Sequence, residues 1–311
     1  MNAPHLHLLL NHVPTIGTVI AFGLLLLAFI RKDEGLKRVS LEVFFVIALL
    51  TLPAYLSGVG TQVALEQREG VSLELMTRHH DAALFASLLM LLSGGFAWLA
   101  LWQWRRLARA RNGTLALVLL FAVLTLTAMA RTATAGGEIR HPEILIDPEA
   151  VQPAVPAWLT AGDVAQFVSG QTWAWPAAEA LHFIGLWLLF GIVLMVNLRL
   201  LGLMKGIPFA AVHRLLPWAA LGLGVNAITG MGFVIAAPGQ YVENIAFFWK
   251  IGLLLLAGLN LLYITIFDGP WKVGAGQDAP LIQKAMAAVT IALWVGVMYY
   301  GRMLPFLGNA F

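Results

Sequence analysis

Three histidines open three apolar stretches of the chain, and imidazole is the side chain here that best suits metal or cofactor chemistry. The three are His12 in NHVPTIG, His80 in RHHDAAL and His182 in EALHFIG. A polar group at the edge of a membrane is costly unless it has a partner, so these positions favour a functional role. His79 is the alternative to His80, because neighbours on a helix point about 100° apart and only one can face a bundle centre.

The composition assigns the chain to a broad class of protein. Of its 311 residues, 60% are hydrophobic and 11% are charged, and the mean hydropathy is +0.82. A soluble domain of this length does not have such a balance, so we predict a polytopic membrane protein in a lipid bilayer. Because cysteine is absent, disulfides, thiolate metal sites and iron–sulfur clusters are excluded. The sequence has no nucleotide-binding fingerprint and no pattern typical of nucleic-acid binding.

Eight apolar stretches are long enough to cross a bilayer, which takes about 20 residues of helix. Polar, glycine-containing or proline-containing segments separate them. The first stretch is followed by charged residues rather than by a small-residue cleavage site, so we expect it to be retained as a helix. The predicted fold is all-α, with spans at residues 13–30, 41–60, 80–103, 114–131, 179–201, 212–237, 244–266 and 281–301.

The basic residues predict how these spans are oriented, because cytoplasmic loops are rich in Lys and Arg. Thirteen of the 19 Lys and Arg residues fall in the loops after spans 1, 3, 5 and 7. Five fall on the opposite side, and Lys250 lies within span 7. We therefore expect both termini outside and a multi-pass protein of the bacterial inner membrane. In this topology the three helix-opening histidines share the outer side, whereas His213 lies on the inner side.

The eight spans fall into two four-helix halves, at residues 1–131 and 179–311, joined by a long outer segment at 132–178. Proline and tryptophan in the joining segment keep a chain irregular and favour the headgroup layer. Within it, the stretch from Thr160 to Gly170 predicts one short helix capped by Thr160 or Asp163. Two interpretations of the segment stay open: an outer (periplasmic) cap on the bundle, or a linker between the halves.

Two further polar residues are predicted near the outer histidines. Lys250 lies within its span, where a lysine faces a cavity, meets an anionic partner or reaches back to the headgroups. Glu179, at the mouth of the fifth span, is its expected ionic partner, and both are candidate cofactor-binding residues. From His80 a stripe of small residues follows one helix face, which leaves room for a flat cofactor or for a neighbouring helix. The stripe is formed by Ala83, Ser87, Met90, Gly94 and Ala97.

Two parts of the chain resemble known families. Residues 5–131 resemble uncharacterised bacterial four-helix membrane domains, which have a His-Pro motif opening the first helix and a histidine opening the third. The matching pieces are NHVPTIG, PAYLSGVG and RHHDAALFASLL. The second half is similar to CopD-type copper-resistance domains and to HemJ-type haem-biosynthesis membrane proteins, through LHFIGLWLLFGIVLMVNLRLLG, HRLLPW and FFWKIGLLLLAGLN. The polar landmarks of those families map onto His182 and Lys250, and the resemblance implies haem or copper bound near the outer surface.

The hypothesis that joins these observations is a b-type haem-binding membrane protein, acting as an electron-transfer subunit near the periplasmic face. His12 and His80 are its expected axial ligands, with His182 as the replacement for either. Lys250 is expected to neutralise a haem propionate. The expected partners are a periplasmic electron carrier, quinone from the bilayer or other subunits of a membrane complex.

Two alternative functions stay open. A copper-handling protein of the CopD type would use the same histidines, assisted by Met76 or Met90, because thioether sulfur suits Cu(I). A structural subunit without cofactor would use the histidines only for hydrogen bonds. No residue demands an enzyme, although the HemJ resemblance leaves oxidation of a tetrapyrrole open.

Overall fold

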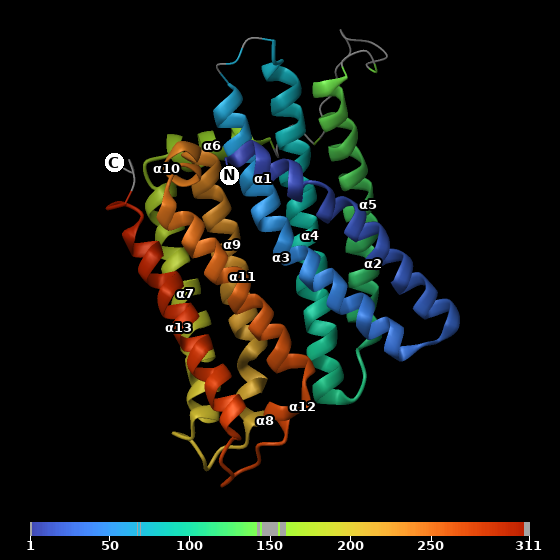
Figure 1. The fold of residues 1–311 in the computed structure, drawn as a ribbon, viewed down its shortest axis with the longest axis vertical. Coiled ribbons are helices and arrows are strands. Elements are labelled where there is room, and N and C mark those ends of the chain that lie inside the picture. Colours follow the sequence, from blue (N-terminus) through green and yellow to red (C-terminus); the bar gives the residue numbers. More distant parts are fainter. Residues whose placement is uncertain are drawn as a thin grey trace. The chain divides into compact units, whose positions relative to one another are not determined.

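The computed structural model describes residues 2–66, 68, 70–141, 144, 155 and 160–307, and that part of the chain is helical, without a β-strand (Figure 1). Eight helical segments in it are long and apolar enough to cross a membrane, which confirms the predicted all-α class and the number of spans. By the length and composition of its helices the chain is a multi-pass membrane protein. The spans are Ala3–Arg31 (α1, Ala3–Leu10, with α2, His12–Arg31), α3 (Glu34–Leu65), α4 (Leu73–Leu107), α5 (Asn112–Arg140), α7 (Ala174–Leu201), Phe209–Ala236 (α8, Phe209–Val212, a 3-10 turn, His213–Leu215, and α9, Leu216–Ala236), α11 (Ile245–Ile266) and α13 (Leu281–Met303). The shorter helices are α6 (Ala161–Gly170), α10 (Pro238–Val242) and α12 (Asp268–Trp271).

Several helices are longer than the apolar stretches that predicted them. α4 begins at Leu73 rather than at residue 80, because the Ser72 hydroxyl caps its first turn by accepting the Leu75 N–H at 3.3 Å. α5 continues to Arg140 rather than ending at residue 131. The difference has a simple cause: a helix can continue into water after its apolar window ends, and apolar length alone does not register such a turn.

The chain divides into two compact units, Met1–Val164 and Ala165–Phe311. The predicted first half, residues 1–131, is therefore shorter than the helical part of unit 1, since α5 extends beyond it. The predicted joining segment, residues 132–178, contains the end of α5, all of α6 and the start of α7. Its middle, residues 142–159 apart from Ile144 and Val155, lies outside the described residues.

The short helix predicted within the joining segment is present as α6, and its predicted cap is confirmed. The Thr160 hydroxyl accepts the Asp163 N–H at 3.1 Å and donates to the Asp163 carboxylate at 2.6 Å. The pair gives a hydrogen-bond partner to the Asp163 N–H, one of the backbone donors that the first turn of a helix leaves without a partner. The Asp81 carboxylate of α4 accepts the Ala161 N–H at 2.7 Å, which ties the start of α6 to unit 1.

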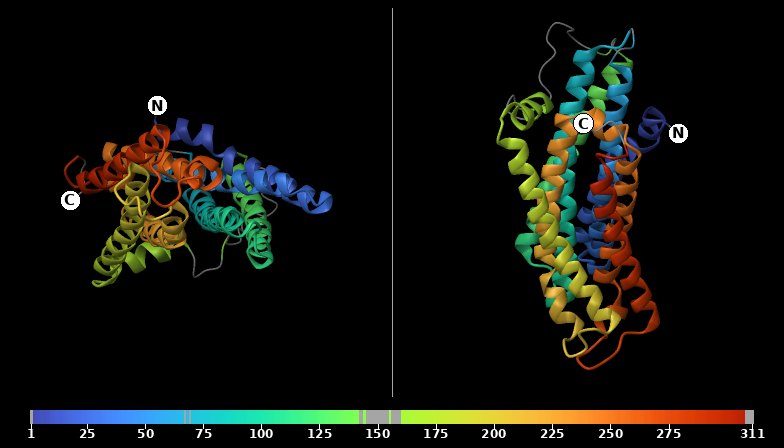
Figure 2. Two further views of the ribbon diagram at one scale, coloured as in Figure 1. Left: turned by 90° about the horizontal axis from the view of Figure 1, so that it is seen from below. Right: turned by 90° about the vertical axis from the view of Figure 1, so that its left-hand side faces the viewer.

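In unit 1, α4 packs along both α3 and α5 (Figures 1 and 2). The small-residue stripe of α4 is where α3 approaches most closely: a Cβ added at Gly94 would lie 2.2 Å from the Cβ of Ala48. On the other side, the Ser93 and Thr125 hydroxyls share a buried hydrogen bond of 3.0 Å between α4 and α5. At Gly94 the stripe therefore serves helix packing, the second of the two predicted uses, and does not leave room for a flat cofactor.

In unit 2, α7 and α9 cross at a pair of glycines. A Cβ added at Gly185 would lie 2.8 Å from the Gly222 carbonyl oxygen, and one added at Gly222 would lie 2.6 Å from the Gly185 carbonyl oxygen. Only glycine allows two backbones to come this close. α13 packs against both α7 and α11.

One buried arginine fixes the connections at the end of unit 2 where α7 finishes. Arg199 is fully buried, and its guanidinium donates to three backbone carbonyls. Nη2 donates to Gly274 at 2.7 Å and to Gln277 at 3.1 Å, and Nε donates to Ile207. Because one side chain bonds both the connection after α7 and the connection after α12, it holds these irregular segments in place.

Candidate cofactor site

Two imidazoles face each other in unit 1. His7 lies on α1 and His79 lies on α4, and their ring centroids are 6.4 Å apart with the ring planes at 75°. Nδ1 of His7 lies 3.1 Å from the Ala54 carbonyl oxygen, and Nδ1 of His79 lies 3.0 Å from the Thr132 carbonyl oxygen. A carbonyl oxygen only accepts, so each Nδ1 carries the proton and donates it. Each Nε2 then keeps the lone pair that binds a metal.

The same local design seats both rings. On α3, the Ala54 carbonyl accepts from His7, and Gly58 follows one helical turn later. On α5, the Thr132 carbonyl accepts from His79, and Gly136 follows one turn later. A Cβ added at either glycine would lie 3.0 Å from Cε1 of the facing histidine, closer than nearly all real contacts. A side chain there would push the imidazole away from its carbonyl. Glycine at these two positions therefore admits the rings.

The predicted ligands His80 and His12 have other surroundings. Nε2 of His80 lies 2.9 Å from the hydroxyl of Tyr55, a buried residue of α3, and the two form one hydrogen bond. His12 is exposed at the first residue of α2. The structure therefore brings together His79, the predicted alternative to His80, and His7, which the sequence analysis did not select. It places His12 and His80 in two separate environments.

The short helix α1 brings His7 to the site. Asn2 caps it by accepting the His5 N–H at 3.1 Å, and Pro4 occupies its first turn, where the absence of an N–H costs nothing. The chain turns at Asn11 before α2 begins. The predicted first span began at residue 13, so it excluded α1. The sequence does hold a signal for this site, namely the glycines of PAYLSGVG and TATAGG, each one turn after an imidazole-accepting carbonyl.

An ion pair lies next to His79 in the sequence and to the glycine of α5. Arg78 Nη1 donates to the Glu138 carboxylate, and both side chains are largely buried. Nε of Arg78 is buried and has no hydrogen-bond partner among the described residues. Arg78, which precedes His79 on α4, thus keeps one buried donor that would suit a carboxylate of a bound group.

In unit 2, His182 also has its Nδ1 in a hydrogen bond. Nδ1 lies 2.8 Å from the Thr229 hydroxyl, which donates its own proton to the Val225 carbonyl at 2.8 Å. The hydroxyl oxygen therefore accepts from His182, and Nε2 of His182 is left with its lone pair. The Lys250 side chain lies within electrostatic reach of this imidazole.

Glu179 has contacts other than the predicted one with Lys250. Its carboxylate accepts the Trp175 indole N–H at 3.2 Å. Burial, with a smaller contribution from the Glu179 charge, raises the pKa of Tyr241 to about 12. A phenol with that pKa stays neutral at physiological pH, so Tyr241 offers Glu179 no compensating charge.

The predicted site residues are divided between the two units. His7, His12, His79 and His80 belong to unit 1, and His182, Lys250 and Glu179 belong to unit 2. Convergence of His12, His80 and His182 on one cofactor stays a prediction. Within the described ranges, no group of three or more His, Cys, Asp or Glu side chains is arranged to hold a metal ion.

Comparisons with protein-family models, with curated proteins and with solved structures give no match. The family resemblances of both halves stay expectations, and the function has to be argued from the residues of the site.

Proposed function

We propose that unit 1 binds a b-type haem through His7 and His79, and that the protein is an electron-transfer subunit of a membrane assembly. The observation that carries the proposal is the 6.4 Å between the two ring centroids. With metal–nitrogen bonds of about 2.0–2.1 Å and roughly 1.1 Å from nitrogen to ring centre, two imidazoles on opposite sides of one metal have centroids about 6.3 Å apart. The separation of the two rings would therefore allow His7 and His79 to hold one metal together.

The number of ligands favours haem over a bare metal ion. The iron of haem already has four ring nitrogens, so two imidazoles complete its coordination. A bare transition metal in a protein usually takes three or four protein ligands, and the described residues offer the pair without a third acidic or imidazole group. Thioether sulfur would help Cu(I), and of the two candidate methionines Met76 lies one turn before His79 on α4, whereas Met90 lies about three turns after it. Copper handling is thus the second candidate.

Residues around the pair have roles that suit this proposal. When bound, haem supplies one-electron transfer at its iron. The Ala54 and Thr132 carbonyls hold the tautomer of each histidine and make Nε2 a stronger donor. The spare Nε donor of Arg78 suits a propionate, the role that the sequence analysis gave to Lys250.

The setting is proposed from the charges of the loops. Both termini outside, in a bacterial inner membrane, would put His7 and His79 near the periplasmic face. A haem at that depth suits exchange with a soluble periplasmic carrier, and quinone can reach it from the bilayer. In this proposal His182 and Lys250 of unit 2 do not hold the haem. They serve contact with a partner subunit or a second function.

A spectrum of the protein purified from its native membrane tests the proposal. We expect a Soret band and an α band in the reduced protein, with one haem iron per chain. His7→Ala and His79→Ala should each lose most of the haem. His12→Ala is the matched control, because His12 is exposed on the same unit and its replacement should keep the spectrum.

Other outcomes of this experiment have clear meanings. Wild-type protein without a Soret band, but with copper by elemental analysis, would replace haem by the copper alternative. Protein with neither metal, whose histidine variants still assemble normally, would support a structural subunit without cofactor. Equal loss of haem from His12→Ala and His79→Ala would refute the assignment of the axial pair.

A further inference from the structure

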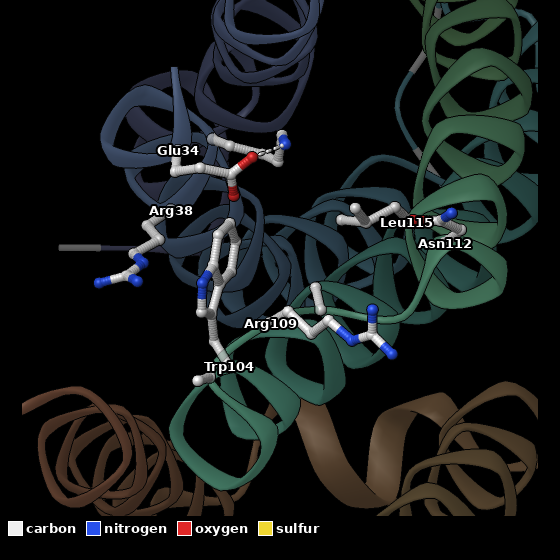
Figure 3. A pocket seen from close by; sticks show the side chains of 9 residues that line it. Glu34, Arg38, Trp104, Arg109, Asn112 and Leu115 are labelled. Atoms are coloured by element: carbon white, nitrogen blue, oxygen red, sulfur yellow. Dashed lines mark hydrogen bonds and ion pairs between the residues drawn. The ribbon is translucent and has the colours of Figure 1, made fainter. Parts of the chain in front are cut away.

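A cavity of about 350 Å³ lies in unit 1, next to Trp104 at the opposite end of α4 from His79. Figure 3 shows the side chains that line it. The start of α3, the end of α4 and the start of α5 form its walls. None of the residues of the histidine pair lines it. Its lining residues include Glu34, Lys37, Arg38, Trp104, Arg109 and Asn112.

The cavity is cationic. Lys37, Arg38 and Arg109 line it, and Glu34 is the one carboxylate among its lining residues. Glu34 pairs with the largely buried Lys37 at 2.5 Å, so this pair is neutral. Arg38 and Arg109 are exposed. The Glu42 carboxylate, one turn after Arg38 on α3, offsets part of the charge of Arg38, and Arg109 leaves the opening with a net positive charge.

An aromatic ring restrains two of the three cations, Lys37 and Arg38. The Arg38 guanidinium lies 4.7 Å from the centroid of the buried Trp104 ring, and the Lys37 ammonium lies 5.9 Å from it. Figure 3 shows the Trp104 ring below Glu34, with Arg38 on one side and Arg109 on the other. Stacking on an indole restrains long side chains that otherwise move freely in solvent.

The amino end of α5 adds to the attraction for an anion. Arg111 precedes its first turn, no side chain caps that turn, and Asn112 lines the cavity. The first N–H groups of a helix carry partial positive charge and bind phosphate readily. Together with the two exposed arginines on either side of Trp104, they make this cavity attractive to an anionic group.

Exposed apolar residues close in sequence to the lining arginines suggest the source of such a phosphate. Val39 follows Arg38, and Leu107 lies two residues before Arg109; their side chains are 46% and 47% exposed. Exposed apolar groups beside basic ones, at the ends of membrane-spanning helices, suit the boundary between headgroups and acyl chains. A soluble phosphate would use the cations but not this apolar surface.

We propose that this cavity binds the headgroup of an anionic phospholipid, with Arg38 and Arg109 on its two sides attracting the phosphate. The site is independent of the haem proposal, because it shares no residue with the histidine pair. It would anchor the turn between α4 and α5 to the membrane surface.

Calorimetric titration of the full-length protein in a neutral detergent tests this site. The probes are dihexanoyl phosphatidylglycerol, dihexanoyl phosphatidylcholine and inorganic phosphate. We expect phosphatidylglycerol to bind more tightly than the other two. At about 1 kcal/mol for each basic residue, Arg38→Gln with Arg109→Gln should weaken its binding roughly thirtyfold.

The matched control removes the same charge elsewhere. Arg214 and Lys272 are exposed basic residues of unit 2 on the side predicted to be cytoplasmic, and Arg214→Gln with Lys272→Gln should change the affinity less than threefold. Equal weakening by both double variants would overturn the site, because it would indicate diffuse attraction. Equal binding of inorganic phosphate and phosphatidylglycerol would overturn the lipid assignment. Arg109→Gln alone, at an exposed turn, keeps the test valid if the double variant is unstable, and it should lose roughly fivefold.

Discussion

The two compact units bury their histidines in different ways. In unit 1, His7 and His79 each donate to a backbone carbonyl and face each other at 6.4 Å. In unit 2, His182 donates to the Thr229 hydroxyl, and the neighbouring charge is that of Lys250. In unit 1 each imidazole lies near a second imidazole, whereas in unit 2 it lies near a lysine, and a positive charge beside an imidazole would oppose a bound metal ion. Whether a histidine can take part in a metal site thus depends on the group that it faces, and not on how many histidines its unit contains.

The space between each histidine and its neighbouring glycine also differs between the units. A Cβ at Gly136 would lie 3.0 Å from Cε1 of His79, whereas a Cβ at Gly230 would lie 3.6 Å from Cε1 of His182. The first distance requires the ring to move, and the second is an ordinary contact. The rings of unit 1 are thus held tightly, and the ring of unit 2 has room for a methyl group.

The largest effects are expected where the units are alike, at their helix crossings. Gly94→Ala in unit 1 and Gly185→Ala in unit 2 place a Cβ within 2.2 Å of Ala48 and within 2.4 Å of Asn226, respectively. We expect each to lower the free energy of unfolding by about 2–3 kcal/mol, measured by titration with a denaturing detergent. The controls are Gly95→Ala and Gly191→Ala, which meet nothing within 4 Å and should be neutral or slightly stabilising. A neutral Gly94→Ala would contradict the close crossing in unit 1.

The next effect should separate the units. Gly136→Ala pushes on His79, and we expect it to weaken haem retention about tenfold, equivalent to about 1.4 kcal/mol. Gly230→Ala, the matched change beside His182, should leave retention within twofold. The measurement is the haem absorbance per folded chain after dilution. Equal losses in both variants would remove the contrast between the units.

The sequence predicted the spans well because apolar length is a local property. It also predicted α6 with its Thr160 cap, because capping depends on residues three apart. It missed the histidine pair for two reasons. His7 lies before the first apolar window, and the choice between His79 and His80 depends on which helix face meets α5, which only packing decides.

A smaller effect is expected at the Glu179 end of unit 2, where Tyr241 has a pKa of about 12. In the unfolded chain a tyrosine loses its proton near pH 10, whereas the folded protein keeps it. Stability should therefore be complete below about pH 10 and fall as the pH rises toward 12. Because Tyr241 is only partly buried, we expect less than about 1 kcal/mol at pH 11. Tyr241→Phe should remove this part of the pH dependence, and an unchanged slope would contradict the raised pKa.

The smallest effect, none at all, is expected from Lys250→Met, and it is the sharpest test of the contrast. If the cofactor site is complete within unit 1, removing the lysine beside His182 should leave the haem content and the α band within error of wild type. If instead the two units share one cofactor and Lys250 neutralises a propionate, retention should fall about tenfold, as expected for a lost charged contact. His79→Ala, measured in the same preparation, shows how large a loss the assay can detect. Because Met keeps most of the volume of Lys, a fall in haem content without a fall in folded protein would point to the lost charge rather than to packing.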